Sequence, residues 1–193
     1  MTWPMFFAWL IKAPLDLGSS ILARILTPFV VPFATGARLP VMLRWMETHD
    51  NDLDGDKGWK TEHVVFLNVQ PGDSEAITTL KLWAKRTLWL WRNAAYRYKY
   101  DRLGAYIPRH IAPRIVGDIR TSDRPGHAGW LLITAGPYWE YYAVIPYLSN
   151  RCVRLRFGWK LKGWAEAWLR GERRDDRAMR VQYINPVKGY GIK

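Results

Sequence analysis

Apolar residues are densest in residues 1–33, and charged residues and helix breakers interrupt the pattern there. The interrupting charges and helix breakers are Lys12, Asp16, Arg24, Pro14, Gly18, Pro28 and Pro32. Because proline and glycine weaken a helix interior, the pattern predicts two short helices, over residues 4–13 and 19–31. Each is shorter than the roughly 20 residues that cross a bilayer unaided. We therefore expect an apolar helical hairpin within residues 1–38.

The middle of the chain predicts one long amphipathic helix, over residues 74–96. Leu80, Trp83 and Trp91 recur at helical spacing on its apolar side, and Asp73 or Ser74 is a suitable N-cap. An apolar run at residues 64–69 predicts a strand before it. After it, aromatic and basic residues alternate over residues 96–100, which also predicts a strand.

The C-terminal half shows the alternation of an antiparallel sheet, with a short helix at residues 164–169. Strands are expected over residues 113–120, 129–134, 138–148, 152–162 and 178–184. The predicted fold is therefore α+β: an antiparallel β-meander of about five to six strands with one long helix, forming a single domain over residues 39–193, plus the N-terminal apolar hairpin.

Two of the predicted strands carry basic residues on every second position. Val153 and Leu155 would face one side of the sheet while Arg154 and Arg156 face the other, which predicts an apolar inner face and a cationic outer face. The candidate anion-binding residues are Arg154, Arg156, Lys160, Lys162 and Arg180.

The N-terminal aromatic residues are spread around the predicted helices instead of forming one stripe. This distribution favours contact with a membrane interface, whereas packing on the protein's own core is the alternative. The candidate membrane-contact residues are Trp3, Phe6, Phe7, Trp9, Phe29 and Phe33.

An acidic turn resembles the opening of a calcium-binding loop. Asp50, Asp52 and Asp54 occupy alternate positions before Gly55, but the twelfth position is Thr61 where a bidentate glutamate is required. The sequence therefore predicts weak calcium binding at most, and a turn capped by its own side chains is the alternative. No other cofactor is expected.

The composition of the chain indicates which class of partner it binds, but it does not indicate a catalysed reaction. The 193 residues include 12 tryptophans and carry a formal net charge of +12, which suits an anionic and partly apolar partner. One cysteine excludes an intramolecular disulfide framework. No nucleophile, metal-ligand or phosphate-loop motif occurs, so an enzyme is not expected.

Several short motifs resemble a family of small proteins that tailed bacteriophages encode and for which no activity is established. They are Leu39-Pro40, Leu43-Arg44-Trp45, Glu47-Thr48, Gly58-Trp59, Trp89-Leu90-Trp91-Arg92, Leu103-Gly104, Phe157-Gly158-Trp159 and Asn185-Pro186. The resemblance implies a viral origin and supplies no site residue.

These observations predict a non-catalytic protein that binds an anionic membrane surface or a membrane-associated partner. Its expected location is the cytoplasmic face of the host inner membrane. The alternative is a basic protein that binds nucleic acid or forms part of the virion. The oligomeric state is not predicted.

Overall fold

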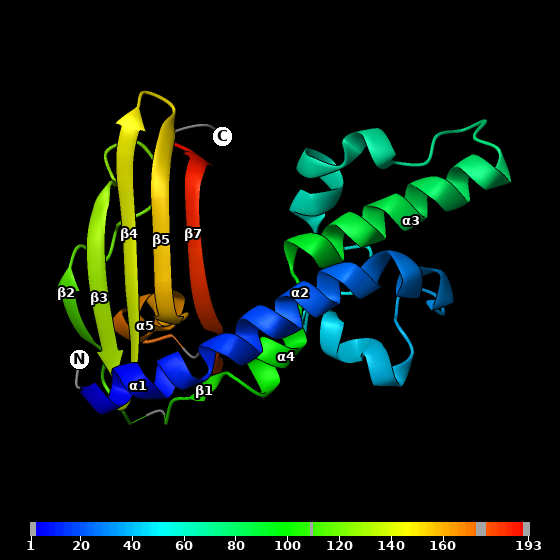
Figure 1. Cartoon of the computed structure of the whole chain (residues 1–193). Helices are drawn as coiled ribbons and strands as arrows, with labels where there is room; N and C mark the ends of the chain where they lie inside the picture. The colour runs from blue at the N-terminus through cyan, green and yellow to red at the C-terminus, as the bar shows by residue number, and fades with distance from the viewer. Residues whose placement is uncertain (1–2, 109, 173–176, 191–193) are drawn as a thin grey trace. The chain divides into compact units, whose positions relative to one another are not determined.

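The computed structural model describes residues 3–108, 110–172 and 177–190 and confirms an α+β fold (Figure 1). The chain forms two compact units: unit 1 comprises Met1–Ala13 with Tyr100–Lys193, and unit 2 comprises Pro14–Lys99. This division differs from the boundary expected at residue 38. The N-terminal helices explain why, because Trp9 belongs to the core of unit 1 whereas Ala23 belongs to the core of unit 2.

The antiparallel sheet of unit 1 has the strand order β2-β3-β4-β5-β7, as the meander predicts. The strands are β2 (Arg114–Gly117), β3 (Gly129–Ala135), β4 (Tyr138–Leu148), β5 (Arg151–Trp159) and β7 (Arg180–Gly189). A second, two-stranded sheet pairs β1 (Ala105–Tyr106) with β6 (Arg177–Ala178). The predicted short helix is α5 (Lys162–Leu169).

The two faces of the large sheet are covered to different extents. On the covered face, Leu131, Tyr142 and Arg156 lie side by side on β3, β4 and β5, and α5 packs there because the amides at its start donate to Glu140. On the opposite, open face, Leu132 and Tyr141 are only half-buried.

The prediction that the basic residues of β5 lie on an outer face is wrong. Arg154 and Arg156 share the covered face with the buried Leu131, because the register pairs Arg156 with Tyr142 and Tyr142 with Leu131. Their charges are tolerated there because carboxylates lie within reach of both guanidinium groups. Those carboxylates are far away in sequence, so the local alternation could not reveal them.

Helix α1 (Trp3–Ile11) packs within unit 1. The ring centroids of Trp9 and Trp139 lie 5.5 Å apart, and Phe6 stacks on Trp139 at 6.4 Å. The indole N–H of Trp9 donates to the Val181 carbonyl at 3.3 Å. This helix therefore covers one part of the open face.

Unit 2 is helical. Its helices are α2 (Ala13–Val30), α3 (Glu75–Arg92) and α4 (Tyr96–Asp101), and both α2 and α4 extend slightly past the unit boundary. Its short helical turns are η1 (Val31–Phe33), η2 (Val41–Met46), η3 (Trp59–His63) and η4 (Val65–Leu67). The long helix is confirmed, and Ser74 is its N-cap: the Ser74 hydroxyl accepts from the Ile77 amide at 3.4 Å.

Two strand predictions in this part of the chain are wrong. The strand expected at residues 64–69 is the 3₁₀ turn η4, and the strand expected at residues 96–100 is α4. Helical geometry at α4 brings Tyr98 against Trp45 in the core of unit 2, so tertiary packing overrides the alternation.

The N-terminal hairpin lacks its expected turn, because α2 begins at Ala13 and continues through Gly18. Pro14 stands in the first turn of this helix, where its missing N–H costs nothing. The Ser20 hydroxyl donates to the Asp16 carbonyl at 2.6 Å one turn later.

Candidate membrane-contact surface

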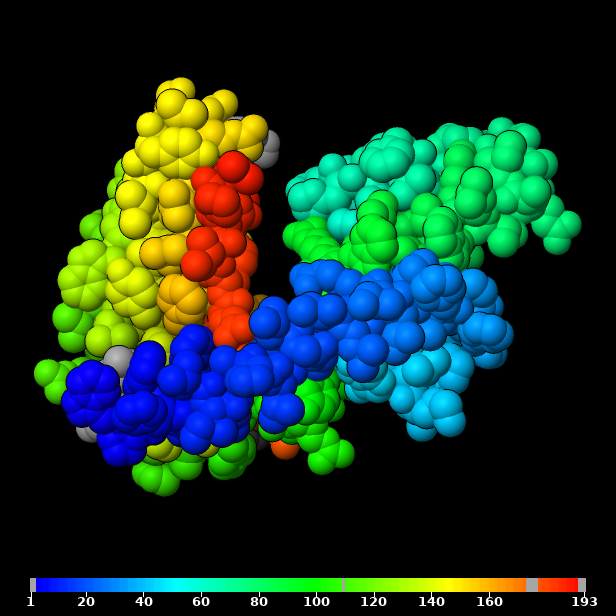
Figure 2. Space-filling view, viewed as in Figure 1, coloured from blue at the N-terminus to red at the C-terminus, as the bar shows by residue number. Residues whose placement is uncertain are grey.

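Helix α2 carries more of the exposed large apolar side chains of unit 2 than any other element, and Figure 2 shows its atoms in blue at the surface. Phe29 is 69% exposed, and the others are about half exposed. The exposed apolar residues of α2 are Leu15, Leu17, Ile21, Leu22, Ile25 and Phe29. A helix in a water-soluble domain normally turns such residues inward.

The buried side of α2 is small and polar. Its residues are Asp16, Ser20, Ala23, Thr27 and Val30. Asp16 is 3% exposed and meets the Lys99 ammonium at 3.3 Å, while the Thr27 hydroxyl donates to the Ala23 carbonyl at 2.6 Å. The helix therefore turns three polar residues together with Ala23 and Val30 toward the protein and its larger apolar side chains away from it.

Helical geometry separates the two sets cleanly. With about 100° between successive residues, the six exposed apolar side chains fall in one arc of about 160°, and the buried residues fall in the opposite half. Arg24 lies at the edge of the exposed arc and is itself exposed. An apolar arc bordered by a cation is typical of a helix that lies in a membrane interface.

Two tryptophans of α3 donate hydrogen bonds to backbone carbonyls of α2. The Trp91 indole donates to the Arg24 carbonyl at 2.9 Å, and the Trp83 indole donates to the Pro28 carbonyl at 2.9 Å. Each of these carbonyls lies four residues before a proline, Pro28 or Pro32, which has no N–H to offer. These hydrogen bonds matter most where water cannot reach, because each unpaired backbone carbonyl in hydrocarbon costs roughly several kcal/mol.

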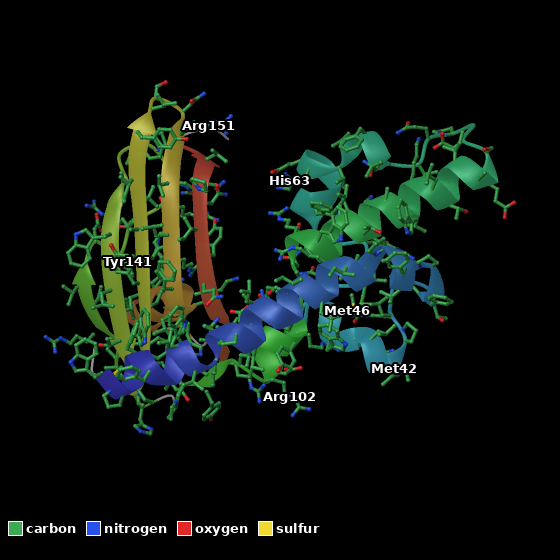
Figure 3. All side chains as sticks on the ribbon, in the orientation of Figure 1. Met42, Met46, His63, Arg102, Tyr141 and Arg151 are labelled. Atoms are coloured by element: carbon green, nitrogen blue, oxygen red, sulfur yellow. The ribbon has the colours of Figure 1, made fainter. Side chains whose placement is uncertain are left out.

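The apolar exposure continues beyond α2. Phe33 on η1 and Val41 and Met42 on η2 are at least 70% exposed. Figure 3 shows the contrast between Met42, which is 82% exposed, and Met46, which is fully buried one turn later. We call the exposed apolar residues of α2, η1 and η2 the α2 surface.

The predicted membrane-contact residues divide between solvent and core. Trp3, Phe7, Phe29 and Phe33 are exposed, whereas Trp9 is buried and Phe6 is packed against the core of unit 1. Trp9 is held because the Arg180 guanidinium lies 4.6 Å from its ring. The even distribution of aromatic residues in the sequence could not make this distinction.

Sequence reasoning missed the aliphatic members of the α2 surface, Leu15, Leu17, Ile21, Leu22 and Ile25. A helix that continued through Gly18 would have shown them on one side. By length and composition alone, the helical segment Trp3–Phe33 is the one among the described residues that could cross a membrane.

The chain belongs to a family of unknown function, DUF7338, whose model matches residues 1–192. No curated protein and no solved structure matches the chain. Family membership therefore supplies no activity, and the functional argument rests on the geometry of the side chains.

The predicted anion-binding residues lie among counter-charges. Arg156 pairs with Glu140, which is fully buried, and Arg154 lies 3.2 Å from Asp123. Burial raises the pKa of Asp123, but Lys188 and Arg154 outweigh burial and hold it below its usual range. The cations of the covered face therefore act within the protein.

The remaining members of that set differ in their surroundings. Arg180 is fully buried, and one of its nitrogens donates to the Trp9 carbonyl at 3.2 Å. Lys162 donates to the Thr121 carbonyl at 2.5 Å and lies 5.5 Å from the Tyr142 ring, whose burial raises the pKa of the Tyr142 phenol. Lys160 follows β5 directly. Together they do not form an open basic patch.

The acidic turn does not gather its carboxylates. Asp54 pairs with Arg86 at 2.8 Å, Asp52 accepts from the Asp54 amide at 3.0 Å, and Asp50 lies beside His49. In the parts of the chain that the structure describes, no group of three acidic, histidine or cysteine side chains could hold a metal ion. The arrangement matches the alternative of a self-capped turn.

Cys152 is buried in the core of unit 1. Burial raises the pKa of its thiol. A thiol that stays protonated and inaccessible is a poor nucleophile, so this residue serves packing.

Proposed function

We propose that this protein binds an anionic membrane surface through the α2 surface, as an interfacial protein that acts by binding. The observation that carries the proposal is the inverted helix: six apolar side chains face outward while Asp16, Ser20 and Thr27 face the protein. A lipid interface is the apolar phase that would cover such a side.

The charge of the chain supports an anionic partner. A net charge of +12 attracts the protein to acidic headgroups, and exposed Arg24 borders the apolar arc. Nucleic acid would be attracted by the same charge, but Arg154 and Arg156 already meet Asp123 and Glu140. In line with the resemblance to phage-encoded proteins, the location that we propose is the cytoplasmic face of the inner membrane of an infected bacterium.

Vesicle flotation tests the proposal. The wild type should float with vesicles that contain phosphatidylglycerol and should stay bound in high salt, because apolar burial is not screened. The triple variant Ile21→Ser, Ile25→Ser, Phe29→Ser loses about 1 kcal/mol per side chain, which together weakens binding about 100-fold.

A matched control removes exposed apolar side chains elsewhere. Tyr106→Ser with Val116→Ser changes two exposed residues of unit 1 and should leave flotation unchanged. If the triple variant floats as well as the wild type, the α2 surface does not contact lipid. If an oligonucleotide binds tightly and vesicles do not, the protein is a nucleic-acid binder instead.

A further inference from the structure

Strand β4 ends, just before its turn to β5, in a run of exposed apolar residues. Ile145, Pro146, Tyr147 and Leu148 are all exposed, and Val187 on β7 is exposed nearby, since its carbonyl accepts from Arg151 at 3.2 Å. A run of four exposed apolar residues is unfavourable in water, and such a run at a hairpin end is typical of a binding surface. We call these residues, with Arg151, the hairpin tip.

The strand register shows that the hairpin tip extends past its neighbour. The first residue of β3, Gly129, pairs with Val144, so residues 145–148 have no β3 partner. Figure 1 shows this end of β4 and β5 at one end of the sheet, Figure 2 shows it as open yellow atoms, and Figure 3 places Arg151 there. Pro146 removes one unpaired N–H from the free edge, which discourages strand addition by another chain.

The carboxylate that lies near the hairpin tip is already paired: Asp123 meets Lys188 at 3.1 Å and Arg154 at 3.2 Å. No aspartate or glutamate occurs in residues 141–165, and none occurs in β7. Arg151 is exposed beside Tyr147 and Leu148. Apolar and aromatic side chains beside an exposed cation match the headgroup region of an anionic bilayer.

We propose that the hairpin tip is a second membrane contact, separate from the α2 surface, that inserts into the headgroup region of an anionic bilayer. It shares the partner of the proposed function but rests on different residues. The free backbone edge of residues 145–148 limits its depth, because unpaired amides and carbonyls are excluded from hydrocarbon. The tip therefore reaches the interface and stops there.

Fluorescent labels at single cysteines test this contact. Cys152→Ala provides a background without the native thiol, and NBD is attached to Leu148→Cys at the tip, Phe29→Cys on α2, or Ala112→Cys as a control. Ala112 is exposed and precedes β2, whose first residue pairs with Thr134 at the other end of the sheet. Vesicles contain phosphatidylglycerol and phosphatidylethanolamine, or phosphatidylcholine alone.

We expect the label at residue 148 to brighten and shift to the blue with the anionic vesicles. Lipids with a quencher near the headgroup should quench it more strongly than lipids with a quencher deep in the acyl chains. The label at residue 112 should not respond. In the unlabelled protein, Tyr147→Ser with Leu148→Ser should weaken vesicle binding about tenfold.

Each other outcome is decisive. A response at residue 29 without one at residue 148 overturns the tip contact and leaves the proposed function intact, whereas the reverse overturns the role of the α2 surface. Stronger quenching by the deep quencher contradicts the limit on depth. A blue shift at residue 148 that grows with protein concentration in the absence of vesicles identifies self-association and overturns the lipid contact.

Discussion

The sheet of unit 1 and helix α2 of unit 2 place their apolar residues in opposite ways. On β3, Leu131 and Ile133 are completely buried, and α5 packs on the same face. On α2, Ile21 and Ile25 are exposed while Thr27 is completely buried. The sheet therefore buries the apolar residues of β3 within the protein, whereas α2 exposes its apolar side, and the proposed lipid contact rests on this difference.

The two regions also differ in the surroundings of their buried carboxylates. Glu140 is buried in unit 1 to fix a helix and a guanidinium, so it serves the fold. Asp16 is buried in unit 2 on the side of α2 that faces the protein, where it pairs with Lys99, while the opposite side of the helix is apolar and exposed. The comparison can be sharpened by substitutions that affect one region and spare the other.

The largest effect is expected at Glu140. Glu140→Ala leaves Arg156 without its carboxylate and leaves the amides of Leu161 and Lys162 without an acceptor. The free energy of unfolding should fall by about 3 kcal/mol in urea titrations, without a direct effect on lipid contact. Glu166→Ala is the control, since the Glu166 side chain is 37% exposed and meets the Lys162 ammonium at the longer distance of 3.6 Å. Equal losses for the two variants would contradict the role of Glu140.

The next largest loss of stability is expected for Trp91, whose indole donates a hydrogen bond to α2. Trp91→Phe keeps the ring and removes the donor to the Arg24 carbonyl. In water the loss should be about 1 kcal/mol, because Trp91 is 43% exposed and water can replace it. The loss should grow when thermal unfolding is measured with anionic vesicles.

Trp168→Phe is the matched control for that substitution. Trp168 is 44% exposed and lies on α5 in unit 1. Its replacement should cost the same with and without vesicles. A vesicle-independent loss at Trp91 would show that the hydrogen bond serves the fold alone.

A smaller effect links Asp123 to acid stability. Its pKa is lowered in the folded protein, so its ion pairs stabilise the fold above the unfolded pKa of about 3.9. This contribution is lost as the pH falls through the lower, folded value. Asp123→Asn should cost at most about 1 kcal/mol near neutral pH and flatten the acid limb of a stability profile. Asp118→Asn, which affects an exposed pair with Arg120, should change the profile less.

The smallest effect is expected for calcium. We predict binding no tighter than about 10⁻⁴ M, because Asp54 is engaged by Arg86 and the twelfth loop position is Thr61. Calorimetric titrations of the wild type and of Asp52→Asn should therefore look alike. A micromolar isotherm that this substitution abolishes would make the turn a calcium site.

Local pattern in the sequence predicted the sheet well and the helical unit poorly. The alternation in residues 129–159 lies on strands that pair with their sequence neighbours, so β3, β4 and β5 were predicted to within a few residues. Residues 96–100 alternate equally well but form α4, because Lys99 and Tyr98 are used in contacts with distant residues. Local pattern does not contain such contacts.

The candidate surface was predicted only in part for the same reason. Trp3 and Trp9 are alike in sequence, and the neighbours that bury Trp9, Val181 and Arg180, lie more than 170 residues away. The exposed side of α2 could not be predicted, because Pro14 and Gly18 indicate a turn by propensity but are tolerated in this helix.

A spin-label scan along α2 tests the central claim most directly. Single cysteines replace residues 20–29 one at a time in the Cys152→Ala background, and each is labelled with a nitroxide. The accessibility of each nitroxide to oxygen and to a water-soluble nickel reagent is then measured in the presence of anionic vesicles. Oxygen accessibility should peak at residues 21, 25 and 29 and reach its minima at residues 20, 23 and 27, with the period of a helix. Nickel accessibility that stays high at residues 21, 25 and 29 would contradict lipid contact by the α2 surface.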